Sequence, residues 1–274
     1  MKLTRLLCVI DPTTNNQRAL KRAAFIAPRS NAAVHALLCF ALPQGVQAAD
    51  SAEFEEAERL RHELWLERLL EPLREQGCTL TTEIRIAADW RSETTRAIRA
   101  SDADLVIKAS RSRTTLQRRL MKTSDWLVLR EARCPVLFVK RDEPGDIQRI
   151  LAAVSLRDKD PTHVALTDRV IAEAREISEQ LGAELHAVSA YRESVNFIHP
   201  PDLARRVGIE RGRAHVGDEE PEELITEVAA RLDASLVIIG SVGRKGMAAA
   251  VVGNTAERIL DTVQADVLSI LHSK

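Results

Sequence analysis

The residues with the clearest chemical potential form a glycine-rich segment near the carboxyl end of the chain. Its spacing is Gly240-x2-Gly243-x9-Gly253, and Asn254 and Thr255 follow directly. Glycine lets the main chain approach an anion closely, and Asn254 with an acid three residues later is typical of a helix N-cap. The free N–H groups at the start of that helix would face the loop. The pattern predicts a phosphate-binding loop, and a purely structural glycine turn is the alternative.

The chemistry that this segment can support is limited. No Gly-Lys-Ser/Thr follows the glycines, which excludes a Walker A loop, and the spacing differs from the dinucleotide-binding Gly-x-Gly-x-x-Gly. The sequence shows no Ser-His-Asp, Cys-His or paired-carboxylate constellation, and no acid suited to hold Mg²⁺ beside the loop. We therefore expect a binding protein without catalytic residues and without a metal site.

Short apolar runs alternate with amphipathic runs and position this loop. In the first half of the chain the strand candidates are 3–10, 33–41, 79–86, 104–108 and 136–140. The helical patterns between them are 17–28, 53–76, 91–100 and 123–131. Strands that alternate with helices predict a parallel sheet with helices on both faces, and the continuous apolar strands agree because both of their faces are buried.

The same pattern occurs twice. The run 101–110 aligns without a gap with the run that ends at Ser241, and three other apolar runs repeat in the same order. A polar Pro/Gly stretch between the copies reads as a linker. We therefore expect an α/β protein with two tandem doubly wound parallel sheets of five strands each, in domains 1–141 and 147–274. The glycine loop would lie at the carboxyl edge of the second sheet, where such domains bind ligands.

The second copy is shorter than the first between its second and third strands. In place of the long helix 53–76 it has only a short run around Asp202. Loss of a whole helix would expose one sheet face, at about 25 cal/mol per Å² of apolar surface. Either the chain lacks the helix, or about twenty residues near Pro200–Pro201 are missing from the sequence. We favour the second explanation because 197–201 leads to no recognisable element, and an intact mass well above 30.4 kDa would support it.

The glycine spacing resembles the nucleotide-binding motif of the universal stress protein family, G-x2-G-x9-G-(S/T). The resemblance covers both copies and is closest to the tandem E type, which also shares the Thr123-Ser-Asp-Trp126 run. It implies the Rossmann-like fold related to the adenine nucleotide alpha-hydrolases, and a stress-response role with at most weak ATPase activity.

The resemblance also implies an adenine nucleotide, with ATP first, bound by the second domain. In ATP-binding members an Asp after the first strand, the second strand and the glycine loop contact the nucleotide. The corresponding residues here are Ser155, Ser189, Gly240, Gly243, Gly253, Asn254 and Thr255. Ser155 replaces the Asp, which removes a charged partner. Two alternatives therefore stay open: a scaffold that has lost nucleotide binding, and a site for another small anionic or apolar ligand.

The first copy departs from the family in the opposite way. It keeps Asp11, but Ala109, Ser112 and Lys122 stand at the glycine positions. Side chains at all three would crowd a phosphate, so we expect no ATP in this copy. The arginines between 111 and 119 form either a solvated face or a patch for an anion or partner.

Other polar residues favour structural roles. His35 and His186 open the second strand of each copy and lack further metal ligands at suitable spacing, so we expect hydrogen bonding or packing. Asp11 before Pro12 is expected to turn the chain, with a residual ligand role as the alternative. Trp126 is expected to anchor a core or an interdomain contact.

Composition narrows the possible partners. The chain is 45% hydrophobic, 29% charged and 3% aromatic, with a net charge of −1, which disfavours disorder and binding to nucleic acid. No apolar run approaches the ~18 residues of a membrane span, and the first residues are not a signal peptide because Asp11 ends a short apolar run. Four cysteines without a C-x-x-C pair indicate buried thiols in a reducing cytoplasm. The family resemblance implies pairing of the two last strands, within the chain or in a homodimer, and the apolar runs 136–139 and 267–270 are suitable for it.

Overall fold

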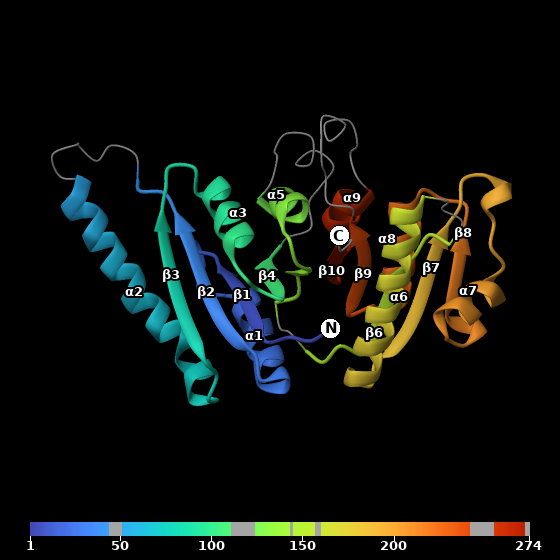
Figure 1. The fold of residues 1–274 in the computed structure, drawn as a ribbon, viewed down its shortest axis with the longest axis horizontal. Coiled ribbons are helices and arrows are strands. Elements are labelled where there is room, and N and C mark those ends of the chain that lie inside the picture. The colour runs from blue at the N-terminus through green and yellow to red at the C-terminus, as the bar shows by residue number, and fades with distance from the viewer. Residues whose placement is uncertain (44–50, 111–123, 143–144, 157–159, 242–254, 272–274) are drawn as a thin grey trace. The chain divides into compact units, whose positions relative to one another are not determined.

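The computed structural model describes residues 1–43, 51–110, 124–142, 145–156, 160–241 and 255–271 of the 274-residue chain (Figure 1). Contacts divide the chain into two compact units, Lys2–Ala109 and Ser110–Lys274, and Met1 belongs to the second unit. The division falls after Ala109 and not at the linker. The domain boundaries 1–141 and 147–274 therefore stay a prediction, which rests on the similarity between the two halves of the sequence.

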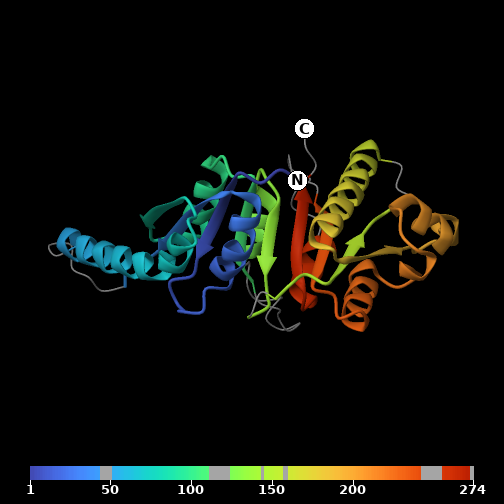
Figure 2. The same ribbon diagram turned by 90° about the horizontal axis from the view of Figure 1, so that it is seen from below.

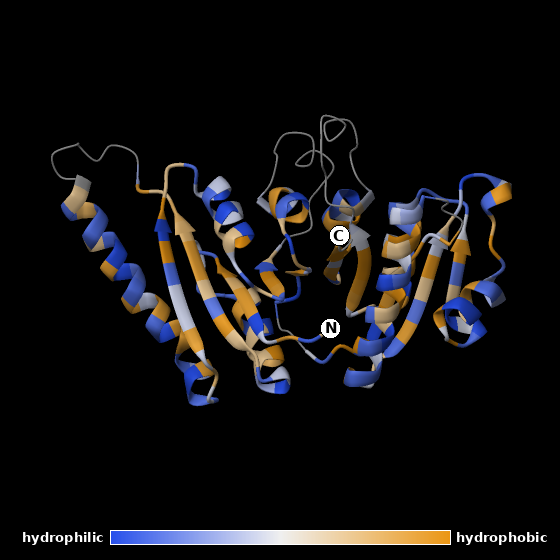
Figure 3. Cartoon of the chain, in the orientation of Figure 1, coloured by the Kyte–Doolittle hydropathy of each residue, from blue (hydrophilic) through white to orange (hydrophobic). Residues whose placement is uncertain are grey.

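The unit Lys2–Ala109 is a parallel sheet with helices against it. Its strands stand in the order β3-β2-β1-β4. They are β1 (Arg5–Ile10), β2 (Ala33–Phe40), β3 (Leu80–Ile86) and β4 (Leu105–Ala109), and its helices are α1 (Arg18–Ser30), α2 (Ser51–Glu75) and α3 (Trp90–Ala100). In the register Leu6 lies beside Val34 on one side and Leu105 on the other, and all three are buried. Figure 3 shows this apolar colouring along the strands and a largely polar surface on α2.

The unit Ser110–Lys274 has six described strands in the order β5-β10-β9-β6-β7-β8. The strands are β5 (Val136–Val139), β6 (Arg149–Ala153), β7 (Glu184–Ala190), β8 (Ala214–Gly217), β9 (Leu236–Ser241) and β10 (Asp266–Leu271). The helices are α5 (Ser124–Glu131), α6 (Pro161–Leu181), α7 (Pro200–Val207), α8 (Pro221–Arg231) and α9 (Thr255–Thr262), with short 3₁₀ turns at Ser194–Asn196 and Arg211–Arg213. Figure 2 shows α6 and α8 on opposite sides of the strands.

These elements confirm the α/β class and the alternation predicted from the sequence. Strands β6 to β10 have the doubly wound order β8-β7-β6-β9-β10, and all of their pairs are parallel. The order in which strands are added reverses between β6 and β9, because β7 and β8 are added on one side of β6 and β9 and β10 on the other. Such a reversal opens a crevice at the carboxyl ends of the two strands.

The two last strands pair with each other. Strand β5 runs antiparallel to β10, with Leu137 beside Leu268, which is the pairing that their apolar sequences predict. The joint is reinforced by polar contacts. Lys140 is buried, and its ammonium donates to the backbone carbonyls of Leu260 and Val263 at the end of α9. The carboxylate of the fully buried Asp266 accepts from the backbone N–H of Lys140.

The second copy has the short helix α7 between its second and third strands, β7 and β8. The sequence predicts there either a sheet face that lacks its helix or a missing segment near Pro200. Helix α7 packs on β7 and β8, with Leu203 and Val207 fully buried. Arg175 of α6 donates to the carbonyls of Arg206 and Val207 and so satisfies the end of α7. This helix of eight residues therefore covers apolar surface of β7 and β8, and the missing segment near Pro200 stays a prediction that the intact mass tests.

No helix among the described residues combines the length and the apolar character needed to cross a bilayer.

Candidate functional site

A cavity of about 310 Å³ lies at the carboxyl ends of the strands in the unit Ser110–Lys274. The ends of β6, β7 and β9 form its floor, the first turns of α6, α8 and α9 form its walls, and it straddles the point where strand order reverses. The residues that line it are Ala153, Val154, Ser155, His163, Leu166, Thr167, Val170, Val188, Ala190, Pro221, Ile225, Ile239, Gly240, Thr255, Ala256 and Ile259. Most of them are apolar, with a few hydroxyl groups and one histidine between them, which is the usual composition of a small-molecule site.

The structure brings three of the predicted site residues together. Ser155, Gly240 and Thr255 come from three separate segments and line this one cavity. The Ser155 side chain is exposed at the cavity, while its carbonyl accepts from the hydroxyl of Thr167 at 3.3 Å. Thr255 is half-buried and is the first residue of α9.

The other predicted residues do not line the cavity or lie outside the described part of the chain. Ser189 is buried in β7 beside Val216 of β8, and its two neighbours in sequence line the cavity in its place. Gly243, Gly253 and Asn254 are outside the described residues, as is most of the basic segment of the first copy. Their roles in binding stay predictions.

The lack of a side chain at Gly240 has a packing cause. A Cβ atom built at Gly240 would lie 2.7 and 2.8 Å from two side-chain carbons of Leu166, and no positive φ is found at this glycine. Real Cβ atoms do not approach carbon so closely, so a side chain at position 240 would force Leu166 of α6 to move. This explains Gly240 without any ligand, and the argument for a binding site therefore depends on the cavity and not on this glycine alone.

Sequence reasoning missed the walls of the cavity. His163, Leu166 and Thr167 come from α6, and Pro221 and Ile225 come from α8. Each segment begins a helix directly after a strand of the parallel sheet, so its first turns reach the carboxyl edge. The available signal was the position of these helix starts: Asp160 caps α6 by accepting from the N–H of Thr162 at 2.7 Å, and a Pro stands at the start of both helices.

The acids near the cavity are held by arginines. Glu222 of α8 accepts from Arg258 of α9 at 2.6 Å, and the buried Glu257 accepts from Arg130 of α5 at 2.5 Å. Among the described residues no three histidine, cysteine or acidic side chains are grouped as a metal site would require. The cavity therefore offers hydroxyl groups, apolar walls and the positive end of α9 as its main binding groups.

In the first copy, Asp11 turns the chain, as the sequence predicts. Its carboxylate accepts from the N–H of Thr13 at 2.9 Å and from the Thr13 hydroxyl at 2.6 Å. The buried side chain of Gln17 closes the same loop, accepting from the Asp11 N–H and donating to the Asp11 carbonyl. These contacts give Asp11 a structural role in the described residues.

A pair of histidines lies away from the cavity, on β7 and β8. His186 Nδ1 is 3.1 Å from His215 Nε2, and Glu184 and Arg213 stand beside them. Burial lowers the pKa of both imidazoles, aided for His215 by the neighbouring His186 and Arg231 and opposed for His186 by Glu184; the pKa of His215 falls to about 4.

This pair predicts a pH dependence of stability. A lowered pKa means that the unfolded chain binds more protons than the folded chain between the ordinary histidine pKa of about 6.5 and the folded value. The contribution of this pair to the free energy of unfolding should therefore be constant above pH 7 and should fall as the pH drops from 6.5 toward 4. Urea denaturation at a series of pH values measures it, and His215→Gln should flatten the slope. A slope that is unchanged in this variant would assign the pH dependence to other groups.

The sequence and the fold identify the family. Residues 2–140 and 151–270 each match the universal stress protein family. The chain is 28% identical to Universal stress protein E of Escherichia coli strain K12, in an alignment that covers 97% of this chain and 93% of the relative. A functionally unknown protein from Pseudomonas aeruginosa PAO1 has a similar structure, with a TM-score of 0.77, 28% identity and coverage of 98% of this chain and 93% of its own. A universal stress protein from Archaeoglobus fulgidus DSM 4304 shares the fold over the whole of both chains, with a TM-score of 0.76 and 17% identity. The chain therefore belongs to the universal stress protein family and contains two of its domains in tandem.

Proposed function

We propose that the cavity in the second repeat binds an adenine nucleotide, and ATP is the first to test. In this proposal the protein is a non-catalytic stress protein, and the occupancy of the cavity by the nucleotide biases its contacts with partners. The observation that carries the proposal is that Ser155, Gly240 and Thr255 meet around one cavity at the point where strand order reverses. Ligands of doubly wound sheets bind at this point.

The residues around the cavity fit such a ligand. Val188, Ala190, Pro221 and Ile225 offer an apolar slot for a base. Thr255 and the start of α9 offer a hydroxyl group and backbone N–H groups for phosphate oxygens. The predicted loop residues Gly243, Gly253 and Asn254 complete the phosphate side in this proposal, and Ser189 contributes through the backbone of β7. No carboxylate group for Mg²⁺ is proposed, so binding without efficient hydrolysis is expected.

Isothermal titration with ATP tests the proposal. We expect saturable binding at one site per chain, and a loss of at least roughly 100-fold in affinity, or about 3 kcal/mol, in Gly243→Arg. Gly212→Arg is the matched control, because a side chain at Gly212 meets open space and it lies in a 3₁₀ turn away from the cavity. Absence of saturable binding, with Gly243→Arg indistinguishable from the wild type, would eliminate nucleotide binding.

A scaffold without nucleotide is the second candidate. Two observations favour it: Ser155 stands where ATP-binding relatives are expected to have Asp, and the glycine at 240 is already explained by Leu166. Another small anionic or apolar ligand in the same cavity is the third. The titration separates the first candidate from these two, and titration with adenosine, which lacks phosphate, addresses the third.

The proposal also includes location and assembly. Cys8 and Cys39 are buried, and burial raises the pKa of both thiols, which supports structural thiols in a cytoplasmic protein. Cys78 and Cys134 are half-buried, so the prediction of buried thiols holds for two of the four. Strand β5 pairs with β10 within one chain, and the resemblance to the family implies that the same kind of pairing can join two copies. A homodimer of the whole chain stays a prediction, which sedimentation velocity tests.

A further inference from the structure

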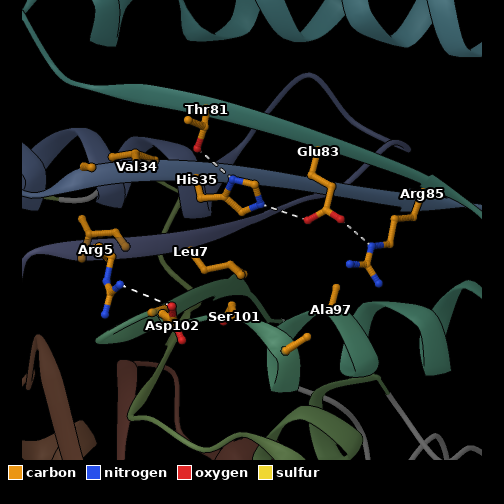
Figure 4. A pocket seen from close by; sticks show the side chains of 14 residues that line it. Arg5, Leu7, Val34, His35, Thr81, Glu83, Arg85, Ala97, Ser101 and Asp102 are labelled. Carbon is orange, nitrogen blue, oxygen red and sulfur yellow. Dashed lines mark hydrogen bonds and ion pairs between the residues drawn. The ribbon is translucent and has the colours of Figure 1, made fainter.

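A second cavity, of about 340 Å³, lies in the unit Lys2–Ala109 (Figure 4). It begins at the amino ends of β1 and β2, beside the end of α3, and extends across the sheet to β3. We call it the His35 groove, after the side chain at its centre. It is lined by residues 5–7, 33–35, 81, 83, 85, 97 and 100–103. The nucleotide proposal makes no use of this groove.

A hydrogen-bonded chain of side chains crosses the His35 groove. His35 Nδ1 is 2.8 Å from the Thr81 hydroxyl, and His35 Nε2 is 3.1 Å from the Glu83 carboxylate. A carboxylate group only accepts, so Nε2 carries a proton, and in the neutral imidazole the Thr81 hydroxyl then donates to Nδ1. Glu83 also accepts from Arg85 Nε at 2.7 Å. Burial raises the pKa of Glu83, but the bonds from Arg85 and His35 outweigh it and hold that pKa below its ordinary value, so Glu83 is a carboxylate at neutral pH.

Positive and negative groups stand together at both ends of the groove. Arg85 donates from Nε to Glu83 and from Nη1 to Glu93, so three of its five N–H groups make no hydrogen bond within the described residues. At the other end the Arg5 guanidinium lies 3.5 Å from Asp102 and is 58% exposed. The floor between the two ends is apolar, formed by side chains such as Leu7, Val34 and Ala97.

The second repeat contains the same positions, which gives an internal comparison. In the first repeat Leu37 pairs with Glu83, and in the second the equivalent Val188 pairs with His215. This register places His215 at the position of Glu83 and Gly217 at the position of Arg85. The contact between Arg5 and Asp102 also has a counterpart, in which Arg149 lies 3.1 Å from Asp233.

The two repeats differ where a ligand would be recognised. The His35 side chain is 33% exposed, whereas the His186 side chain is 7% exposed and lies against His215. Glu83 and Arg85 of the first repeat are replaced by His215 and Gly217 in the second. A simpler explanation of charges on an edge strand is that they block pairing with another chain, and β3 is an edge strand. That role accounts for Glu83 and Arg85, but not for the apolar hollow beside them or for Arg5.

We propose that the His35 groove binds a small zwitterion with an apolar body, of the size of an amino acid or a dipeptide. A simple anion would be attracted by Arg5 and Arg85 and repelled by Glu83 and Asp102, and a simple cation would meet the opposite arrangement. A molecule that carries an ammonium and a carboxylate can satisfy both signs, and its apolar side chain can cover the floor. A volume of about 340 Å³ is at the small end of ligand pockets, which suits a ligand of this size.

Three forms of one dipeptide test this proposal. Alanyl-leucine carries both charges, N-acetyl-alanyl-leucine only the negative one, and alanyl-leucine amide only the positive one. Titration followed by NMR of the protein should show saturable binding of the first, and at least roughly tenfold weaker binding of each blocked form, about 1.4 kcal/mol. Absence of saturation by alanyl-leucine, or equal binding of a blocked form, would overturn the proposal.

Variants locate the binding and separate it from the nucleotide site. Glu83→Gln and Arg85→Gln should each lower the affinity for alanyl-leucine by at least roughly tenfold. Ala100→Trp should do the same by filling the groove from an exposed position that leaves the hydrogen-bonded chain intact. The matched control is His215→Gln, at the Glu83 position of the second repeat, and it should bind as the wild type does. If Ala100→Trp is folded by circular dichroism and still binds fully, the site is elsewhere and the proposal is wrong.

Discussion

Asp266→Ala is expected to lower the free energy of unfolding of the second unit by about 3–5 kcal/mol, since each hydrogen bond to a buried charged group is worth about 1.5–3 kcal/mol. Asp266 is completely buried at the start of β10. Its carboxylate accepts from the backbone N–H of Lys140 at 2.8 Å and of Arg141 at 3.2 Å. Alanine would remove this acceptor from both donors, and the N–H of Lys140 lies in a buried place where water cannot replace it. Urea denaturation followed by circular dichroism measures the loss.

The chain provides a matched control in its other unit. Asp104 also accepts from two backbone N–H groups, those of Thr4 and Arg5, at 2.8 and 2.9 Å, but in an exposed position. Water can replace the carboxylate there, so Asp104→Ala should cost only about 1 kcal/mol. Equal losses in the two alanine variants would show that burial of Asp266 is not what makes its contacts valuable.

A second variant separates the contribution of the Asp266 carboxylate to stability from that of Lys140. Lys140→Met keeps an apolar stem of similar length but removes the donor to the carbonyls of Leu260 and Val263 at the end of α9. If the joint between β5 and β10 depends on both groups, this variant also lowers stability, and the double variant with Asp266→Ala costs less than the sum of the two.

The sequence predicts the elements of this fold well because each is a short-range pattern. The apolar run 136–140 becomes β5, Val136–Val139, and the long amphipathic pattern 53–76 becomes α2, Ser51–Glu75. The apolar sides of these elements must be buried whatever their neighbours are. The doubly wound class and the repeat follow from the same patterns together with the resemblance between the two halves, whereas the order of the strands comes from the structure.

What the sequence did not predict depends on contacts between distant residues. The packing of Leu166 on Gly240 and the contact of Arg175 with the end of α7 both join elements that are far apart along the chain. A reader of the sequence sees a glycine and a shortened helix, and cannot see the side chain that explains each. The same holds for the His35 groove, because β2 and β3 become neighbours only after α2 has crossed between them.

The candidate site was predictable in part for the same reason. Thr255 and Gly240 belong to one continuous motif, and Ser155 follows a strand that the repeat already locates. The walls from α6 and α8 have no motif of their own. Their position at the carboxyl edge is a property of the doubly wound topology, and it became visible only with the structure.

Ala190→Trp is expected to abolish binding of ATP and of adenosine together, with a loss of at least roughly 100-fold for each. Ala190 ends β7 and lines the cavity on its apolar side, where an indole would fill the slot proposed for the base. Ala100→Trp, the same substitution in the His35 groove, is the matched control and should leave both affinities unchanged.

Thr255→Val tests the other end of the cavity and makes the two ends distinguishable. Valine has nearly the shape of threonine but lacks the hydroxyl, so ATP should bind about tenfold more weakly, the worth of one hydrogen bond of about 1.4 kcal/mol. Adenosine has no phosphate and should bind to Thr255→Val as it does to the wild type. Loss of both ligands would place Thr255 beside the nucleoside instead, and an unchanged affinity for ATP in both Thr255→Val and Ala190→Trp would show that the nucleotide binds outside this cavity. The pair of variants thus assigns an orientation to the ligand: base toward the end of β7, phosphates toward the start of α9.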